Sequence, residues 1–412
     1  MKNVQIIYIF KLFYTLSYIE ATEPVFLDFA SSYEVNDLAI QEFVRVSKIK
    51  GNSSGINSHA KYLKQLEYNA SNVIASKIVA NNDNIIFTPS ATMSNNCVIL
   101  GVANRYHKCH FITSKIEHKS VLDVFKYLEK NGYKVTYLDV DSSGKININQ
   151  LKNSIRRDTK LISIQMINSE IGVKQDIELI GKIALNNRVL FHCDASQGFC
   201  RYDINVDLMN IDFLTISGHK IGAPKGIAAL YVRNIDELKP ILFGSGNIIY
   251  PGSSPTALIS AFAAAVQNFE YNNEKIISNF YILKNELEKI KNIYINSVEP
   301  SHILSVSIDG VLYQDIIERM KNYSFSTGCS CNKNGLSNVI TSLDKSRPPC
   351  TIRVSFSDKV NAEVLVKFAQ ELKLVIDKLR SEKIIDNGCQ NAVKQYKGYS
   401  NVLQKIHELL QI

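Results

Sequence analysis

The sequence contains no tryptophan, and none of its eight cysteines forms a Cys-x-x-Cys pair. The missing pairs argue against a zinc ribbon, and the single Cys-x-Cys at Cys329 and Cys331 is a weak metal signal, so we predict no metal site. No block of basic residues concentrates the net charge of +8, so no nucleic-acid partner is predicted. The cysteines are spread thinly through the chain, which indicates reduced thiols in a reducing compartment.

Long uninterrupted apolar runs are also missing. Residues 1–23 are apolar, but Lys11 divides them, so they match neither the core of a signal peptide nor a membrane span. We predict that they are an extension of a cytoplasmic protein. Because no acidic residue precedes Glu20, a targeting segment for a mitochondrion or related organelle stays open as the alternative. No other stretch is long and apolar enough to predict a membrane partner.

The chain of 412 residues is long enough for two domains, and its 45% hydrophobic and 21% charged residues are typical of a globular protein. Seven strand-like apolar runs alternate with amphipathic stretches between residues 37 and 270. This alternation predicts an α/β fold, with a mainly parallel seven-stranded sheet and helices on both faces. The predicted division is an N-terminal extension (1–23), a small α+β domain (24–36 with 275–383), a large domain (37–274) and a C-terminal helical tail (384–412).

Polar side chains follow five of the strand-like runs, at the point where each run ends. In a parallel sheet these positions converge, and ligands bind beyond the carboxyl ends of the strands. A purely structural sheet would not require polar residues at all five places. The five stretches are Ser90-Ala91-Thr92, Glu117-His118, Asn168-Ser169-Glu170, Asp194-Ala195-Ser196-Gln197 and Ser217-Gly218-His219-Lys220.

Each candidate also has a structural interpretation. The helix start at Ala91 and Thr92 suits a bound phosphate, and equally an ordinary N-cap. Asp194 ends an apolar strand and needs a cation there, which is either a protonated ring nitrogen or the partner in a structural salt bridge. His118 suits stacking on a planar ring and proton transfer, or a solvated helix start. Lys220 suits covalent chemistry through its amine, or a solvated turn.

A phosphate site, an aspartate for a pyridinium, a histidine for the ring and a lysine for an imine are together the parts of a pyridoxal phosphate site. Their order resembles the cysteine desulfurases of the class V aminotransferase superfamily, which implies fold type I with the cofactor in the large domain. The matching stretches are FLDFASS (26–32), GNSSGINSH (51–59), ATMSNN (91–96), EHKSVL (117–122), NSEIG (168–172), DASQ (194–197), SGHKIGAPKGIAALYVR (217–233), STGCSC (326–331) and TIRVSFS (351–357).

The resemblance also implies the role of each residue. Lys220 would hold the cofactor covalently and later move protons, His118 would stack on the ring and assist proton transfer, and Cys331 would accept the sulfur. Asn52 and Arg353 would bind the substrate carboxylate. The other implied cofactor contacts are Ala91, Thr92, Ser217 and His219 near the phosphate, Asp194 at the ring nitrogen, Ser169 and Gln197 at the phenolic oxygen, and Ser253 reaching the neighbouring subunit.

The implied activity is the conversion of L-cysteine to L-alanine and an enzyme persulfide, by a homodimer that passes sulfur to acceptor scaffold proteins, for example in iron–sulfur cluster assembly. Another class V enzyme, acting on selenocysteine or another amino acid, stays open. So does a catalytically weak partner subunit of a desulfurase. Four departures from the family pattern bear on whether the chain is catalytically active. Ser169 replaces an asparagine and Met93 replaces a glutamate. Residues 244–255 are short and lack the usual Arg and Glu, and Cys329 is an extra thiol.

Overall fold

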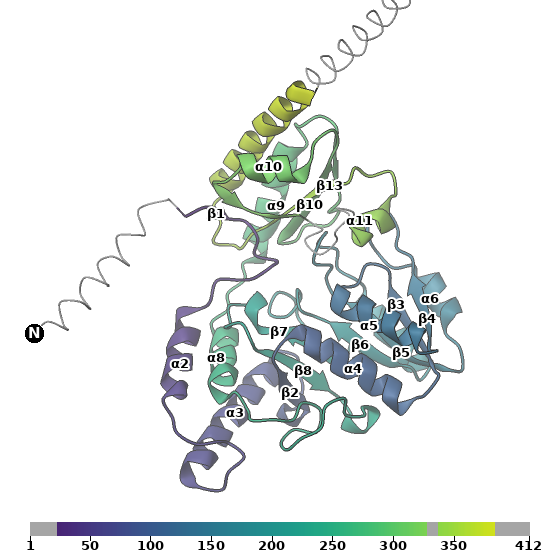
Figure 1. Ribbon diagram of the computed structural model, residues 1–412, viewed down its shortest axis with the longest axis vertical. Helices are drawn as coiled ribbons and strands as arrows, with labels where there is room; N and C mark the ends of the chain where they lie inside the picture. Colours follow the sequence, from purple (N-terminus) through teal and green to yellow (C-terminus); the bar gives the residue numbers. More distant parts are fainter. Residues whose placement is uncertain (1–22, 328–336, 384–412) are drawn as a thin grey trace, which may run out of the picture.

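The computed structural model describes residues 23–327 and 337–383, and its strands form a large sheet, a smaller sheet and a two-stranded pair (Figure 1). The smaller sheet lies at one end of the molecule and the large sheet, with most of the helices, at the other. The predicted α/β architecture is confirmed. The first 22 residues, the predicted C-terminal tail and the stretch with Cys329 and Cys331 lie outside the described residues.

The large sheet has seven strands in the order β2-β8-β7-β6-β5-β3-β4. Strand β8 runs antiparallel to both of its neighbours, and the other neighbouring strands pair in parallel. Each strand coincides with one of the seven predicted runs. The strands are β2 (Ile85–Thr88), β3 (His110–Ser114), β4 (Lys134–Leu138), β5 (Thr159–Gln165), β6 (Leu190–Asp194), β7 (Phe213–Ser217) and β8 (Ala228–Val232).

Helices cover both faces of this sheet because neighbouring side chains on a strand point to opposite faces. On β3, Phe111 belongs to a buried cluster with α4 and α5, and Ile112 belongs to one with α3, α7 and α8. No helix in the described part of the chain is long and apolar enough to cross a membrane. The helices are α2 (Asp37–Ser47), α3 (Ser58–Ser76), α4 (Ala91–Arg105), α5 (Lys119–Lys130), α6 (Ile148–Ser154), α7 (Ile177–Asn186) and α8 (Thr256–Gln267).

The smaller sheet is antiparallel, in the order β12-β13-β10-β9. Its core includes Leu27, from near the start of the chain, together with apolar residues between Ile276 and Leu379. The division of the chain into domains stays a prediction. A last helix covers 362–383. The other elements are β1 (Val25–Phe26), α9 (Asn273–Leu287), β9 (Ile293–Ile295), β10 (Ile303–Ile308), α10 (Tyr313–Arg319), β11 (Tyr323–Ser324), β12 (Ser326–Thr327), α11 (Asn338–Leu343) and β13 (Cys350–Ser355).

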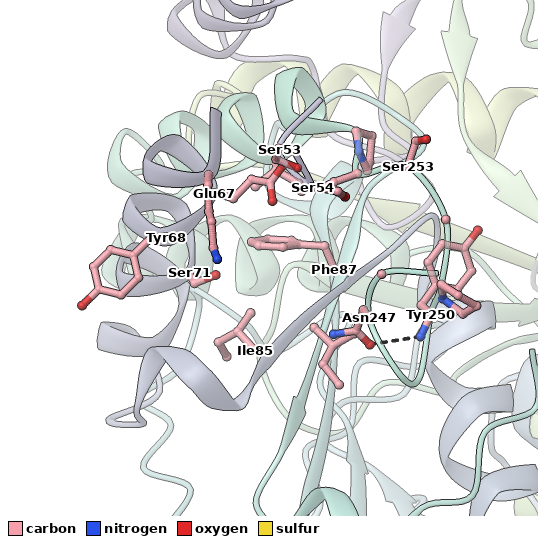
Figure 2. Close-up of a pocket in the computed structure, with 18 of the residues that line it drawn as sticks. Ser53, Ser54, Glu67, Tyr68, Ser71, Ile85, Phe87, Asn247, Tyr250 and Ser253 are labelled. Atoms are coloured by element: carbon pink, nitrogen blue, oxygen red, sulfur yellow. Dashed lines mark hydrogen bonds between the residues drawn. The ribbon is translucent and has the colours of Figure 1, made fainter. Parts of the chain in front are cut away.

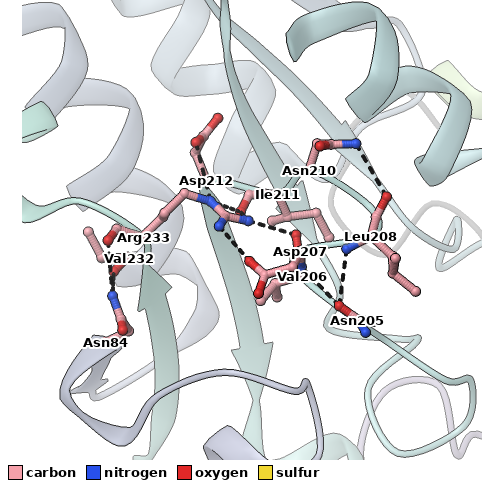
Figure 3. Close-up of polar contacts among 10 residues, drawn as sticks. All are labelled: Asn84, Asn205, Val206, Asp207, Leu208, Asn210, Ile211, Asp212, Val232 and Arg233. Carbon is pink, nitrogen blue, oxygen red and sulfur yellow. Dashed lines mark hydrogen bonds and ion pairs between the residues drawn. The ribbon is translucent and has the colours of Figure 1, made fainter.

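An arginine after β8 anchors the chain that leads into β7 (Figure 3). The Arg233 guanidinium donates to the carbonyl oxygens of Val206 (2.8 Å) and Ile211 (3.1 Å) and to the Asp207 carboxylate (2.5 Å). Asp212 in turn accepts from the backbone N–H of Phe191 on β6. This network fixes the amino end of β7, whose carboxyl end leads into the predicted site.

We predict that Arg233→Met lowers the free energy of unfolding by about 1–3 kcal/mol, because several hydrogen bonds to a charged donor are lost together. Denaturant unfolding followed by circular dichroism measures the change. Arg157→Met is the matched control, since Arg157 is exposed and has no hydrogen bond to another described residue. Equal stability of the two variants would contradict an anchoring role for Arg233.

Candidate active site

A cavity of about 320 Å³ lies at the carboxyl ends of the parallel strands of the large sheet. The strands end at one level, because Asp194 on β6 pairs with Gln165 on β5 and with Thr215 on β7. Arg353, on β13 of the smaller sheet, also lines the cavity. Ten predicted site residues line it: Ala91, Thr92, His118, Ser169, Asp194, Gln197, Ser217, His219, Lys220 and Arg353.

Asp194 is buried and its carboxylate accepts three hydrogen bonds. Its Oδ1 accepts from the Ser196 backbone N–H (3.0 Å) and hydroxyl (2.6 Å), and its Oδ2 accepts from Asn95 Nδ2 (2.9 Å). Within the described ranges no lysine, arginine or histidine forms an ion pair with it. A buried carboxylate that has donors but no cation fits a protonated ring nitrogen, one of the two alternatives that the sequence left open.

The start of α4 and the turn after β7 form a set of donors suited to a phosphate. Ser90 accepts the backbone N–H of Met93 (3.2 Å), which leaves the N–H groups of Ala91 and Thr92 at the helix start. His219 Nδ1 is buried and has no hydrogen-bond partner among the described residues. Burial, with a smaller effect of Lys220, lowers the pKa of His219 to about 4, so its ring is neutral. These donors and Asp194 together fit pyridoxal phosphate.

Lys220 lies on a 3-10 turn (Gly218–Lys220) directly after β7. Its Nζ donates to the carbonyl oxygens of Ala30 and Ser31, each at 2.6 Å. Burial, with smaller effects of the positive charges of Arg353 and Arg201, lowers the pKa of this amine to about 7. The amine is therefore substantially neutral near pH 7, which a nucleophilic lysine requires.

Arg201 is a buried cation that the sequence analysis missed. Its Nη2 donates to the backbone carbonyl of Lys220 (2.6 Å), and its guanidinium lies 5.3 Å from the centre of the Phe269 ring. It forms no ion pair with another described residue. Nothing in the local sequence around Arg201 distinguishes it from a surface arginine, because its role depends on contacts with distant segments.

Arg353 is held by two distant segments of the chain. Its Nη2 forms an ion pair with Asp28 (2.7 Å), and its Nη1 donates to the Ser169 carbonyl (2.8 Å). Its Nε is buried and has no partner among the described residues. The guanidinium fork is thus oriented before a carboxylate binds. Asp28 was not predicted as a site residue, although it belongs to the stretch FLDFASS that carries the family resemblance.

Gln197 and His118 occupy two further sides of the cavity. Gln197 Nε2 donates to the Ala30 carbonyl (2.8 Å), and its Oε1 lies 3.1 Å from His302 Nε2, so one amide hydrogen remains for a ligand. His118 is the N-cap of α5, lines the cavity and is exposed. Next to it, Glu117 is fully enclosed, and burial raises the pKa of its carboxyl to about 8.

Two predicted site residues do not line this cavity. Asn52 and Ser253 contact each other (Nδ2 to Oγ, 3.5 Å), and Ser253 lines a second cavity of about 570 Å³ (Figure 2). That cavity lies between the loop of Ser53 and Ser54 and the segment 246–255. The predicted roles of Asn52 and Ser253 stay predictions. Cys331 and Cys329 lie outside the described residues, so their roles also stay predictions.

Known proteins are similar to this one over most of the chain. The model of the family "Aminotransferase class-V" matches residues 25–367. A cysteine desulfurase IscS from Ehrlichia chaffeensis is 37% identical over an alignment of 380 residues that covers 87% of this chain and 92% of the relative. A solved structure of SspA in complex with cysteine is 34% identical, with a TM-score of 0.74, and covers 81% of this chain and 99% of its own. A NifS-like protein is 25% identical, with a TM-score of 0.79 and coverages of 86% and 99%.

We predict that the Lys220 amine reacts with acetic anhydride with a midpoint near pH 7, because only the neutral amine is nucleophilic. An ordinary lysine has a pKa of about 10.4. Peptide mass spectrometry after brief labelling of the cofactor-free protein across pH measures this, with exposed lysines of the same chain as the internal standard.

Removing a nearby cation should raise this midpoint. Arg353→Gln is therefore expected to move it to higher pH, whereas Arg347→Gln, which does not line the cavity, is expected to leave it unchanged. A wild-type midpoint near that of the exposed lysines would show that the pKa of the Lys220 amine is not lowered.

Proposed function

Because this chain belongs to the cysteine desulfurases of the aminotransferase class-V family, we propose that it removes sulfur from L-cysteine, releases L-alanine and holds the sulfur as a persulfide on Cys331. The observation that carries the proposal is the Lys220 amine, whose pKa is lowered to about 7 in a cavity that also contains Asp194 and the Arg353 guanidinium. A nucleophilic amine, an anion for a ring nitrogen and a fork for a carboxylate are what an amino-acid substrate and pyridoxal phosphate require.

We assign pyridoxal phosphate to this cavity as the cofactor. When bound, it supplies an electron sink beside the α-carbon of the substrate. Lys220 would hold it through its amine, and Asp194 would stabilise the charge on its ring nitrogen. Gln197 and Ser169 would lie at its phenolic oxygen, and its phosphate would be held by Ala91, Thr92, Ser217 and His219.

The described residues provide binding and proton transfer for an amino-acid substrate. Arg353 binds the α-carboxylate, and because Asp28 and the Ser169 carbonyl already orient its fork, little further ordering is needed. The Lys220 amine, which exchanges a proton readily near pH 7, removes and returns a proton at the substrate carbon. His118 lines the same cavity and holds a second exchangeable proton.

The sulfur step balances without an outside oxidant or reductant. The C–S bond of cysteine breaks, an S–S bond to Cys331 forms, and a proton takes the place of sulfur on the β-carbon. L-cysteine and the Cys331 thiol thus become L-alanine and the persulfide. We propose that the persulfide then passes to a sulfur-acceptor scaffold protein, such as one that assembles iron–sulfur clusters, and that the reaction takes place in the cytoplasm.

We predict that Cys331→Ser lowers alanine release from L-cysteine by about 100-fold or more, because the sulfur acceptor is lost. The assay measures alanine from the cofactor-loaded protein with a thiol reductant. Cys329→Ser is the matched control in the same stretch and is expected to retain turnover within about twofold. Lys220→Ala should abolish release.

Other outcomes would replace this function with one of its alternatives. Alanine release that Cys331→Ser leaves intact would indicate another class V lyase chemistry. A wild-type protein that is loaded with cofactor and releases no alanine would indicate the catalytically weak partner subunit.

We also propose a homodimer whose contact includes the second cavity. Two loops beside that cavity expose large apolar side chains: Ile56 is 91% exposed, Phe243 is 88% exposed and Ile248 is 62% exposed. Apolar side chains gathered beside a polar groove are typical of a protein interface. Ser253 follows Ile248 in the second of these loops and lines the cavity, where a second copy of the chain would meet it.

We predict that Phe243→Asp weakens dimerisation by about tenfold or more, because a charge would be buried in the apolar contact. Sedimentation velocity over a range of concentrations measures this. Leu208→Asp is the matched control, since Leu208 is 70% exposed in the segment anchored by Arg233. A wild-type chain that sediments as a monomer at micromolar concentration would contradict the homodimer.

A further inference from the structure

Four polar side chains form a continuous hydrogen-bonded row across one side of the cavity. Asn95 Nδ2, on α4, donates to Asp194 Oδ2 (2.9 Å) and to Ser120 Oγ (2.9 Å) on α5. Ser120 Oγ lies 2.8 Å from Nδ1 of His118. Asn95 is fully buried, so its amide is shielded from water. The row therefore connects the carboxylate at the end of β6 with the histidine at the start of α5.

The chemistry of the groups fixes the direction of each hydrogen bond. An ionised carboxylate only accepts, so the Asn95 atom facing Asp194 is the amide nitrogen. Ser120 Oγ accepts the second hydrogen of that nitrogen, which leaves the hydroxyl proton of Ser120 directed at His118 Nδ1. The backbone N–H of Ser120 also donates to Nδ1 (3.1 Å). Two donors meet this nitrogen, so it carries a lone pair and no proton.

The other amide atom of Asn95 supports this direction. Its Oδ1 is buried and has no hydrogen-bond partner among the described residues. Burying an amide oxygen without a partner destabilises the folded state, and turning the amide over would bring that oxygen against the Asp194 carboxylate. The orientation in which the Asn95 nitrogen donates both of its hydrogens is thus more stable than the flipped one, although it leaves the oxygen without a partner.

We propose that Ser120 and Asn95 are positioning residues that hold His118 in the tautomer with its proton on Nε2. In the described part of the chain Nε2 has no hydrogen-bond partner. His118 then offers the cavity a proton donor and no lone pair, and the Lys220 amine is the basic group there. This inference rests on the proposed function only in taking the cavity as the active site.

Charged groups face His118 from three elements: Asp194 from β6, Lys220 from the turn after β7, and Lys119 and Asp123 from α5. Desolvation by the surrounding protein lowers the pKa of His118, although part of the residue is open to the cavity. The two lysines act in the same direction and the two aspartates oppose them. The ring is accordingly neutral at pH 7, where the tautomer matters.

Nitrogen-15 NMR of the full-length protein with ¹⁵N-labelled histidine rings tests the inference, with and without pyridoxal phosphate. His118→Gln identifies the signals. We expect Nδ1 of His118 to appear as an unprotonated nitrogen and Nε2 as a protonated one. In Ser120→Ala one of the two donors to Nδ1 is lost, so the pKa of His118 should rise by roughly half to one unit, since protonation of Nδ1 becomes easier.

Two further variants separate this positioning role from general stability. Ser120→Thr keeps the hydroxyl and should restore the wild-type pKa of His118. Ser196→Ala removes a donor to the same Asp194 carboxylate but lies outside the row, so it should leave the ring tautomer unchanged. A protonated Nδ1 in the wild type, or a pKa of His118 that Ser120→Ala does not raise, would overturn the inference. Because the NMR readout needs no turnover, a failure of desulfurase activity would be seen separately.

Discussion

The Lys220 amine must stay partly unprotonated and yet be held in place. Both sheets contribute residues that do this. Burial and the cations Arg353 and Arg201 oppose protonation, and the carbonyl oxygens of Ala30 and Ser31 fix the position of the amine. The large sheet supplies Lys220 through β7, and the smaller sheet supplies Arg353 through β13. The segment around Ala30, which enters the cavity from near the start of the chain, contacts both groups.

Several polar groups of the cavity have hydrogen-bond partners in parts of the chain that are remote in sequence. Asp28 pairs with Arg353, Asn95 connects Asp194 to the His118 side of the cavity, and Gln197 connects Ala30 to His302. A buried polar group without such partners would destabilise the fold, so these contacts specify the geometry of the site as well as stabilise it. The same partners orient the groups that we propose act on the substrate.

The sequence predicted the seven strands of the large sheet and nine residues of the cavity from local patterns, and the family resemblance added Arg353. A strand such as β6 is recognised from its apolar run, and Asp194 is a candidate because it ends that run. The sequence did not predict Asp28, Asn95, Ser120 or Arg201 as site residues. Their roles arise from contacts between segments up to 325 residues apart, and no local pattern reports such contacts.

The ion pair between Asp28 and Arg353 also limits when the site can form during synthesis. Asp28 is translated early, but its partner leaves the ribosome only after more than three hundred further residues. The strands of the large sheet, all between Ile85 and Val232, can pair in the meantime. The N-terminal segment must therefore wait for β13, and this long loop closure makes assembly of the cavity a late event in folding. A nascent chain can thus pair the strands of its large sheet before Asp28 and Arg353 can complete the cavity.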